Sequence, residues 1–245
     1  MDLGDRMKLY EAKMAHDRCM PLLPICARLD GKAFHAWTRD LERPYDQRLH
    51  ALFVETTKFL VEETGARVGY TQSDEISLIW YSDSIESQVF FDGKIHKMVS
   101  VLASMATAFF NKSVCSSFGE PRSLALFDCR IWQVPSLEEA ANVLVWRELD
   151  ATRNSVQMAA QAVYSSKQLF RKDTAEMQAM LREKGVDWNE YPNWAKRGTY
   201  IQRRKFTRLL TPDERERIPE KHRPEPSVLV ERTDTCLLYT SPSPR

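Results

Sequence analysis

The sequence predicts an α+β protein built on a ferredoxin-like antiparallel sheet, with helices on one face and a helical extension toward the C-terminus. Three observations carry this prediction. Short apolar runs and longer segments with helical spacing follow one another in the order β-α-β-β-α-β. The 245 residues, 43% hydrophobic and 28% charged, suit an ordinary globular protein with one sizeable core. Residues 136–211 then combine helical patterns with a basic composition.

The β-α-β-β-α-β order, called the repeat below, begins with a strand followed by a helix. A preceding helix over Leu3–Cys19 is expected to end before two prolines. Ile25–Leu29 alternates as a strand does, and Gly31 ends it. Over Tyr45–Thr64 the apolar residues fall at helical spacing, and Gly65 is placed to terminate this helix.

The second half of the repeat is a pair of strands, a helix and a last strand. Arg67–Thr71 and Ile76–Tyr81 are predicted strands joined through Ser73–Glu75. A helix rich in Met, Val, Leu and Phe is expected over Lys94–Val114, and Ser123–Trp132 supplies the fourth strand. This order is the split arrangement of ferredoxin-like sheets.

Two helices are expected in the extension. Ser136 and Glu139 have the spacing of a capping box and open a long helix that continues toward Tyr164. Asp173–Lys184 has helical spacing and is closed by Gly185.

The chain therefore divides into four parts. We expect a core with its N-terminal helix over residues 1–135 and a helical, basic extension that closes the same domain over 136–211. The Pro-, Arg- and Glu-rich stretch 212–235 is predicted to be a poorly ordered tail. Residues 236–245, CLLYTSPSPR, resemble the in-frame translation of a sequencing adapter, so we expect the natural C-terminus to be absent.

Charge and cysteine content narrow the class of protein. The formal net charge of +1 says little about partners, because an acidic face can balance a basic one. The five cysteines are scattered without a Cys-x-x-Cys pair, which favours reduced structural thiols over a zinc site. A charged N-terminus, and no run near the roughly 18 apolar residues of a membrane span, predict a soluble cytoplasmic protein without membrane contact.

Two acidic motifs carry most of the functional information. The sequence RLDG ends the first strand at Asp30, and QSDE opens the third at Asp74. Because the first and third strands of this topology are antiparallel neighbours, Asp30 and Asp74 are expected at one edge of the sheet. Two carboxylates there suit Mg²⁺, which prefers oxygen ligands and is completed by water and substrate phosphates. Two such ions are an arrangement used for in-line phosphoryl transfer.

The glycine after the first acid has a possible role of its own. Without a Cβ, Gly31 lets the backbone approach metal and phosphate closely. The amides that follow, over Lys32–His35, are predicted to form a concave cradle for a triphosphate. Taken singly, the first motif is equally compatible with a turn after a strand, and the second with an acidic hairpin tip. Their shared place in the topology favours the catalytic interpretation.

At these residues the chain resembles the tRNA-His guanylyltransferase family, whose members add nucleotides to the 5′ end of tRNA in the 3′-to-5′ direction. Collinear blocks carry the resemblance. They are RLDGKAFHAW, RPYD, YTQSDEISL, FDCRIWQVPS, WRELDATRNS and KRGTY, which begin at Arg28, Arg43, Tyr70, Phe127, Trp146 and Lys196.

The resemblance implies a fold, a site and partners. Asp30, the Gly31 carbonyl and Asp74 would bind two Mg²⁺ ions, and Glu75 would be a supporting catalytic acid. Ser73 and Asp74 would bind the nucleotide together with the first block, that is Asp30, Gly31, Lys32, Ala33, Phe34 and His35. The family fold resembles the polymerase palm, which makes residues 1–135 a palm-like catalytic core. The family also implies GTP and ATP as substrates, tRNA as partner and a homotetramer.

One departure separates the chain from the enzymes devoted to tRNA-His. Those enzymes carry His-Ile-Asn-Asn-Leu-Tyr-Asn where this chain reads TRNSVQM over residues 152–158, and only Asn154 matches. The sequence is similar instead to the Thg1-like branch of bacteria, archaea and some other lineages. That resemblance implies templated repair of tRNAs that lack 5′ nucleotides.

Other polar residues are candidates for phosphate contacts. His35 is placed to contact phosphate or nucleobase, although a single histidine after a strand is often structural. Arginine grips phosphate bidentately and lysine acts as a point charge, but each such residue is also compatible with a solvated surface. The candidates for the triphosphate or the RNA 5′ phosphate are Arg43, Lys94, Lys97 and Arg130, and the RPYD block adds Asp46 to the nucleotide site.

The C-terminal third is locally basic, with aromatic residues interleaved among the charges. That combination suits an RNA backbone and exposed bases, although solvated helix faces show the same pattern. The RNA-binding candidates are Asn154, Lys167, Arg171, Lys196, Arg197, Arg203 and Arg204.

The leading hypothesis is a Mg²⁺-dependent nucleotidyltransferase that activates a 5′-monophosphorylated tRNA with ATP or GTP and then adds an NTP through its 3′-hydroxyl. Two alternatives remain open at this stage. A palm-type nucleotide cyclase would use the same paired acids without RNA. A noncatalytic RNA-binding module would use a ferredoxin-like sheet, although the first strand offers no aromatic residue for stacking.

Overall fold

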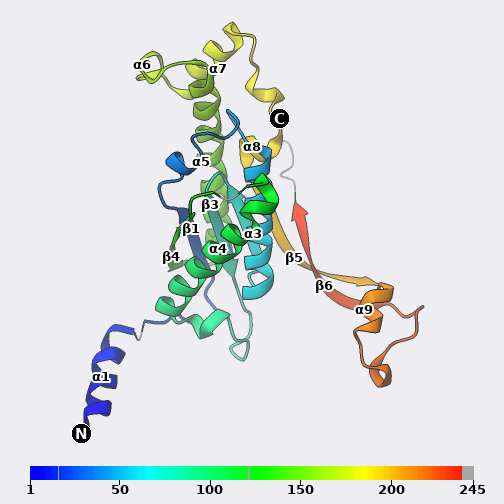
Figure 1. The fold of residues 1–245 in the computed structure, drawn as a ribbon. Coiled ribbons are helices and arrows are strands. Elements are labelled where there is room, and N and C mark those ends of the chain that lie inside the picture. The colour runs from blue at the N-terminus through cyan, green and yellow to red at the C-terminus, as the bar shows by residue number, and fades with distance from the viewer. Residues whose placement is uncertain (16, 121, 239–245) are drawn as a thin grey trace.

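A computed structural model describes residues 1–15, 17–120 and 122–238 of the chain. Its centre is an antiparallel sheet with strand order β4-β1-β3-β2-β5-β6 (Figure 1). The order β4-β1-β3-β2 is that of a ferredoxin-like sheet, which confirms the predicted fold class. The strands are β1 (Ile25–Gly31), β2 (Val68–Gln72), β3 (Glu75–Trp80), β4 (Phe127–Gln133), β5 (Thr199–Arg208) and β6 (Val230–Leu238).

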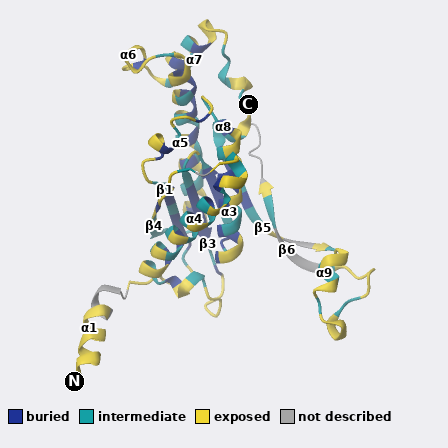
Figure 2. Cartoon of the chain, in the orientation of Figure 1, coloured by how far each residue is buried: buried dark blue, intermediate teal, exposed yellow. Residues whose placement is uncertain are grey.

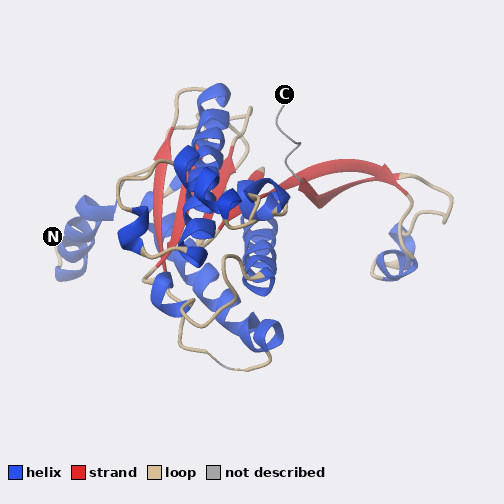
Figure 3. Ribbon diagram, turned by 90° about the horizontal axis from the view of Figure 1, so that it is seen from above, coloured by secondary structure: helices blue, strands red, loops and turns tan. Residues whose placement is uncertain are grey.

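Helices cover both faces of this sheet, as the view from above shows (Figure 3). The repeat contributes two long helices to one face, and the extension contributes a long helix to the other. The helices are α1 (Leu3–Ala15), α2 (Phe34–Trp37), α3 (Gln47–Thr64), α4 (Ile95–Phe118), α5 (Leu137–Val163), α6 (Ser166–Leu169), α7 (Thr174–Glu183), α8 (Asn193–Arg197) and α9 (Pro212–Glu216). Short 3-10 turns lie at η1 (Phe90–Gly93), η2 (Trp188–Glu190) and η3 (Glu220–His222).

Alternation along β1 decides which helix each strand residue meets. Ala27 and Leu29 point into the main core beneath α3 and α4. Cys26 points to the opposite face, where it packs with Ile79 and with Ala140 of α5. The predicted helices of the repeat do share one face, and α5 adds a third layer on the other. That second face is the one to which Asp30 also belongs, because it lies four residues beyond Cys26.

The main core is dominated by aromatic rings from four elements, α2, α3, α4 and β4. Phe34, Phe53, Phe110 and Phe127 lie with ring centroids 5.0 to 5.9 Å apart. Trp37 stacks on Phe34 at 5.4 Å and closes the cluster on the α2 side. The buried residues form the dark interior between the sheet and α3 and α4 in Figure 2. The segment after Asp30 is therefore anchored directly in the core.

The boundaries of α3 follow the predicted signals closely. Asp46 caps its first turn by accepting from the amides of Arg48 and Leu49, which satisfies two otherwise unbonded donors. Gly65 ends the helix with φ of 70°, a conformation that glycine adopts without steric cost. The helix consequently starts after the RPYD block rather than at Tyr45, within two residues of the prediction.

The predicted N-terminal helix is shorter than expected. It ends at Ala15, and the chain that follows runs beside the segment preceding α4, with Arg18 paired to Lys94. The Cys19 amide donates to the Gly93 carbonyl at 2.9 Å, so this backbone is held by tertiary contacts instead of helical ones. The prediction that the helix reaches Cys19 is therefore wrong.

The stretch 212–235, expected to be poorly ordered, carries regular secondary structure in the described part of the chain. It holds α9, η3 and the start of β6, and β6 pairs with β5 along a hairpin that projects from the body (Figure 1). Its alternating residues are mostly polar and charged, so the sequence offered no apolar strand signal. Residues 239–245 of the adapter-like stretch lie outside the described residues, and its assignment stays a prediction.

Among the described residues, α4 is the one helix long and apolar enough to resemble a membrane span. One face of this helix is fully buried in the main core, through Met98, Leu102, Ala106 and Phe110. That burial against the sheet accounts for the apolar composition of the helix.

Truncating the central ring of the aromatic cluster should destabilise the fold. Phe110 is completely buried, so Phe110→Ala removes the ring and leaves a cavity, at a cost of about 3–5 kcal/mol. Phe170→Ala is the matched control, because that ring is 71% exposed and its loss should change stability by less than about 0.5 kcal/mol. Urea denaturation of both variants measures the difference, and equal midpoints would contradict the packing described here.

Candidate active site

The sheet brings the two acidic motifs together at one edge. In the antiparallel pairing of β1 with β3, Asp30 is the direct partner of Glu75. The Gly31 amide also donates to the Asp74 carbonyl at 3.1 Å, which fixes the end of β1 against the turn. That turn consists of two residues, and Ser73 adopts φ of 53° in it, as tight hairpins require. Asp74 is thus presented at the tip of a rigid hairpin.

The environment of Asp74 disfavours its own negative charge. Burial raises the pKa of the Asp74 carboxyl, and the nearby Asp30 charge raises it further. A hydrogen bond from Ser73 and the proximity of His35 oppose this shift but do not cancel it. A partly buried carboxylate beside a second acid is the arrangement that a divalent cation would relieve.

The donor set fits Mg²⁺ better than a metal held by protein alone. In the described chain, no group of three or more His, Cys, Asp and Glu side chains forms a metal site. Two carboxylates would therefore be the side-chain ligands of a bound Mg²⁺ ion. Backbone oxygen, water and phosphate would fill its remaining coordination positions. Mg²⁺ accepts that division because it retains several waters and is commonly shared with substrate phosphates.

Glu75 is engaged by α5 rather than free for metal. Arg147 donates to both of its carboxylate oxygens, at 2.6 and 2.8 Å, and also to Asp150 at 3.0 Å. The side chains of Arg147 and Glu75 are only 10% and 14% exposed. Burial raises the pKa of Glu75 more than the adjacent guanidinium lowers it. The geometry gives Glu75 a supporting position, in which it ties α5 to the acidic edge.

The predicted phosphate cradle follows β1, with one amide already used. The Lys32 amide donates to the Leu126 carbonyl at 2.8 Å, which leaves the amides of Ala33 to His35 at the start of α2. Phe34 belongs to the buried core, so its side chain cannot face a nucleotide. Gly31 is required here because an added Cβ would lie 2.3 Å from the Phe34 ring. Packing, rather than metal approach, explains this glycine.

A cavity of about 340 Å³ opens beside the acids. Its walls include Asp30 and Asp74 on the sheet side and Arg147 and Asn154 on the side of α5. The cavity is contiguous with a smaller one of about 80 Å³, because both are lined by Gln72, Ser73 and Met158. The acidic edge therefore lies at the junction of two hollows.

Aromatic residues line the smaller cavity. Trp194 stacks on His50 with ring centroids 4.4 Å apart, and burial lowers the pKa of His50 to about 4. The hydroxyl of Tyr45 donates to the Ser155 carbonyl at 2.6 Å. These aromatic rings offer a planar ligand a surface on which to stack, beside the charged Glu42 and Arg43 that also line the cavity.

Three of the predicted nucleotide residues, Arg43, Asp46 and Ser73, line this smaller cavity. Arg43 is exposed there, and its guanidinium donates only a long hydrogen bond of 3.4 Å to Thr38. Asp46 is buried, and its carboxylate is occupied by Arg48 and by the amides of α3. Asp46 therefore shapes the cavity wall, and its carboxylate is not available to a nucleotide.

The structure places Lys94 and Lys97 at the wrong end of the sheet for the role predicted from sequence. Both lie at the start of α4, which follows β3 where that strand leaves the acidic edge. Trp80 at the end of β3 pairs with Ile25, five residues and about 17 Å from Asp30 along β1. Within one chain they cannot reach the same phosphate. These lysines follow the acids closely in the sequence, but β3 runs away from the acidic edge before α4 begins.

Arg130 lies nearer the site, one cross-strand pair away from the pair that contains Asp30 on the same face of the sheet. It pairs with Arg28 across β1 and β4 on the α5 face, and Asp128 is its neighbour at 3.9 Å. Asp128 in turn pairs with Asp30, which makes it an exposed third carboxylate on the same row. Sequence reasoning missed Asp128, although the FDCR block contains it.

The predicted RNA-binding residues do not form one surface. Asn154 lines the large cavity, whereas Lys167 and Arg171 are exposed beside α6, at the far end of the helical extension (Figure 1). Lys196 donates to the Asn189 carbonyl and Arg197 pairs with Glu148 at 3.2 Å.

The last two RNA-binding candidates belong to β5. Arg203 lines a separate hollow with Trp80, toward the end of the sheet opposite the acids, and the exposed Arg204 donates to Gln202. The candidates are therefore spread over three regions.

Several site residues escaped sequence reasoning. Arg147 was detectable, because it lies in the WRELD block three residues before Asp150, a spacing that places both on one helix face. Gln157 and Gln161, which also line the large cavity, carried no sequence signal as isolated amides. His50 and Trp194 are far apart in sequence, and only tertiary packing joins them.

Comparisons with known proteins agree with this fold and show the family of the chain. A sequence model of the family described as tRNAHis guanylyltransferase matches residues 4–135. The chain is 32% identical over 225 residues to an uncharacterized protein of Acanthamoeba polyphaga mimivirus, covering 82% of this chain and 77% of that protein. It is 27% identical over 202 residues to the tRNA(His) guanylyltransferase of Candida glabrata, covering 76% and 85%.

Solved structures give the same result. A bacterial tRNA(His) guanylyltransferase (Thg1)-like protein in complex with ATP matches with a TM-score of 0.78 and 39% identity, over 83% of this chain and 87% of that one. A second such structure, in complex with GTP, matches with a TM-score of 0.75 and 33% identity, over 98% and 92%. A palm-like sheet with paired carboxylates at its edge, together with these matches, defines a nucleotidyltransferase. The chain belongs to the tRNA(His) guanylyltransferase family.

Removing the charge of Asp74 should stabilise the metal-free protein. Because the pKa of Asp74 is raised in the folded state, its ionised form opposes folding above that pKa and has no effect once both states are protonated. The Tm of the wild type should therefore fall as pH rises through the raised pKa, whereas Asp74→Asn should lack that fall and melt higher at pH 7.

Thermal melts in EDTA and in Mg²⁺ check this expectation. Mg²⁺ should raise the Tm of the wild type, through binding to the folded state, and leave that of Asp74→Asn unchanged. Asp83→Asn, at an exposed position beyond the far end of β3, is the control and should behave as wild type. A lower Tm for Asp74→Asn in EDTA would contradict the electrostatic account.

Breaking the ion pair between α5 and the sheet should be costly. Arg147→Met leaves Glu75 in a largely buried place with only the longer contact to Arg28 at 3.8 Å, and should cost about 3 kcal/mol. Arg153→Met on the same helix removes a 68% exposed arginine paired with Asp150, and should cost less than about 0.5 kcal/mol. Urea denaturation compares the two, and equal stabilities would show that the pair does not fasten α5.

Proposed function

We propose that this chain is a Mg²⁺-dependent 3′-to-5′ nucleotidyltransferase that extends the 5′ end of tRNA. The observation that carries the proposal is the convergence of Asp30 and Asp74 at the junction of two cavities, with the Asp74 pKa raised. Family membership supports the reaction class, and the bacterial relatives in complex with ATP and GTP support triphosphates as substrates.

The reaction has two balanced steps. In the first, a 5′-phosphate oxygen of the RNA attacks the α-phosphate of ATP or GTP and pyrophosphate leaves. In the second, the 3′-hydroxyl of an incoming NTP attacks the activated 5′ phosphate, loses its proton and releases AMP or GMP. Mg²⁺, when bound, supplies charge neutralisation for the attacking and leaving oxygens. No covalent bond to the protein is needed in either step.

The chain's own residues position the reactants. Asp30 and Asp74 would hold the metal ions, and the amides of Ala33 to His35 would receive phosphate oxygens. The aromatic hollow around His50 and Trp194 suits the nucleobase. Glu75 and Arg147 keep α5 in register with these groups. Preorganised charge of this kind is the main source of acceleration in phosphoryl transfer.

The sequence TRNSVQM over residues 152–158 supports repair of truncated tRNAs over dedicated guanylylation of tRNA-His. The segment lies on α5, where Asn154 and Met158 line the large cavity, so the departure falls at the cavity that this proposal assigns to the substrate. The homotetramer implied by the family remains a prediction, which light scattering of the purified chain tests through a mass four times that of the protomer.

Incubation of 5′-truncated tRNA with labelled NTPs and Mg²⁺ tests the reaction. The wild type should extend the 5′ end, and Asp30→Ala or Asp74→Ala should each reduce extension by more than about 100-fold, since losing an outer-shell partner of a metal ligand already costs 10–100-fold. Asp83→Ala is the matched control and should retain full activity.

Two results would redirect the proposal. Cyclic nucleotide formed without RNA would favour a cyclase. RNA binding without extension, even with 5′-triphosphorylated RNA, would falsify the transferase and favour a noncatalytic module.

A further inference from the structure

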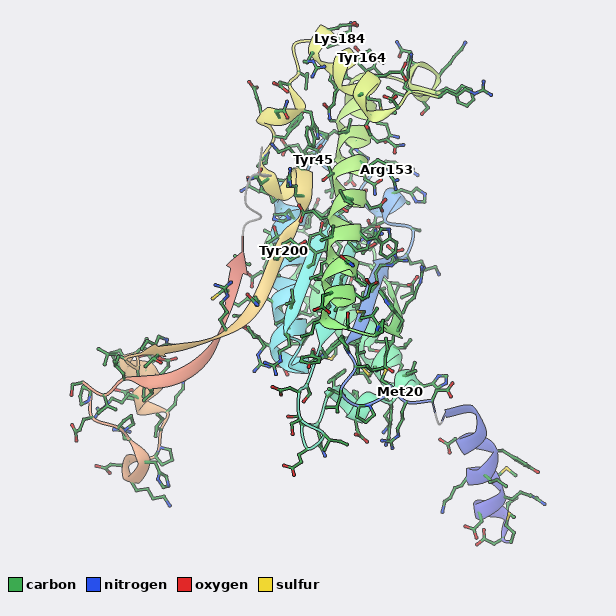
Figure 4. All side chains as sticks on the ribbon, turned by 180° about the vertical axis from the view of Figure 1, so that it is seen from behind. Met20, Tyr45, Arg153, Tyr164, Lys184 and Tyr200 are labelled. Atoms are coloured by element: carbon green, nitrogen blue, oxygen red, sulfur yellow. The ribbon has the colours of Figure 1, made fainter. Side chains whose placement is uncertain are left out.

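Four carboxamide side chains converge on the large cavity. Asn154, Gln157 and Gln161 lie on one face of α5, at the i, i+3 and i+7 positions that a helix aligns. Gln72, the partner of Glu75 across β2 and β3, contributes a fourth from the sheet. We call these four residues the carboxamide wall. Figure 4 shows α5 running along this side of the sheet, with Arg153 labelled in the same stretch.

The carboxamide wall has hydrogen-bonding capacity that the folded chain does not use. In the described part of the chain, none of its four side-chain carboxamides makes a hydrogen bond. Some carboxamides elsewhere are used by the fold itself: Asn111 bonds to two carbonyls and an amide, and Gln133 exchanges bonds with Met20. Groups left open around a cavity are available to a ligand.

The chemistry of the wall selects the kind of ligand. A carboxamide is neutral and offers both donors and an acceptor, so it matches the edge of a nucleobase. Phosphate would call for cations, and metal for carboxylates. Met158, which lies between the amides on the same helix face, adds an apolar surface against which a base can pack. The wall is therefore suited to bases rather than to phosphate or metal.

The length of the wall selects a polynucleotide over a single nucleotide. From Asn154 to Gln161, α5 advances about 10 Å at 1.5 Å per residue. Successive bases along a strand are spaced by about 3.4 Å, so this length matches about three stacked steps. A single base is already suited to the separate aromatic hollow of Trp194 and His50.

We infer that the carboxamide wall binds the base edges of the RNA acceptor end and so positions its 5′ terminus at Asp30 and Asp74. The inference rests on the proposed function and adds to it the residues that hold the polynucleotide. In this arrangement the amides of α5 read the terminal bases, and the incoming nucleotide occupies the aromatic hollow. The wall thereby separates the two substrates.

The test replaces two exposed members of the wall together, Gln157→Leu and Gln161→Leu. Leucine keeps helix propensity and similar size but removes the hydrogen bonds. Steady-state extension is measured on 5′-truncated tRNA that carries a 5′-triphosphate, which bypasses the activation step. The KM for tRNA should rise about tenfold, the loss of roughly one net hydrogen bond, while the KM for NTP stays within about twofold.

Controls separate the inference from folding and from the proposed function. Gln178→Leu, on α7 and away from the cavity, should leave both KM values unchanged, and melting curves should match for all variants. An unchanged KM for tRNA in the double variant, or a rise confined to the KM for NTP, would overturn the inference while leaving the reaction intact. Absence of extension by the wild type would refute the proposed function before any variant is compared.

Discussion

The site depends on the bidentate ion pair between Arg147 and Glu75. Glu75 belongs to the strand that carries Asp74, and Arg147 belongs to the helix that forms the far wall of the large cavity. The pair is largely buried, so neither partner can leave without stranding a charge. It therefore fixes the distance between the acidic edge and α5, and with it the width of the cavity. The extension is part of the site and cannot be treated as an appendage of the palm-like sheet.

The same edge carries an opposing electrostatic strain. Asp30 and Asp74 are held together by the backbone, through strand pairing and the bond from the Gly31 amide, although their charges repel. Backbone hydrogen bonds do not depend on side-chain charge, so the strand register can hold a repulsive pair in place. Under the proposed function a bound cation would offset this repulsion, and functional sites commonly give up stability in this way.

The sequence alone predicted a strand or helix where its apolar residues recur with the spacing of that element. The catalytic acids were predicted because the order β-α-β-β-α-β determines which strand ends share an edge, and α3 because Asp46 and Gly65 carry explicit terminal signals. Lys94 and Lys97 were misplaced because their distance from the acids depends on the direction of β3. The β5–β6 hairpin escaped because its residues are largely charged. The pairing of His50 with Trp194, 144 positions apart, has no local signal.

The two cavities differ in the chemistry they offer, and this difference organises the whole site. One is small and rich in aromatic rings, with a histidine kept neutral by burial and with Arg43 in its wall, and it offers a stacking surface to a flat ring. The other is large, with acids at one end and open amides along its length. They meet at Gln72 and Ser73, beside the turn that carries Asp74. An enzyme that joins a free nucleotide to a polynucleotide end needs two unlike binding surfaces that meet at the reacting groups, and under the proposed function the two cavities on either side of this hairpin would supply them.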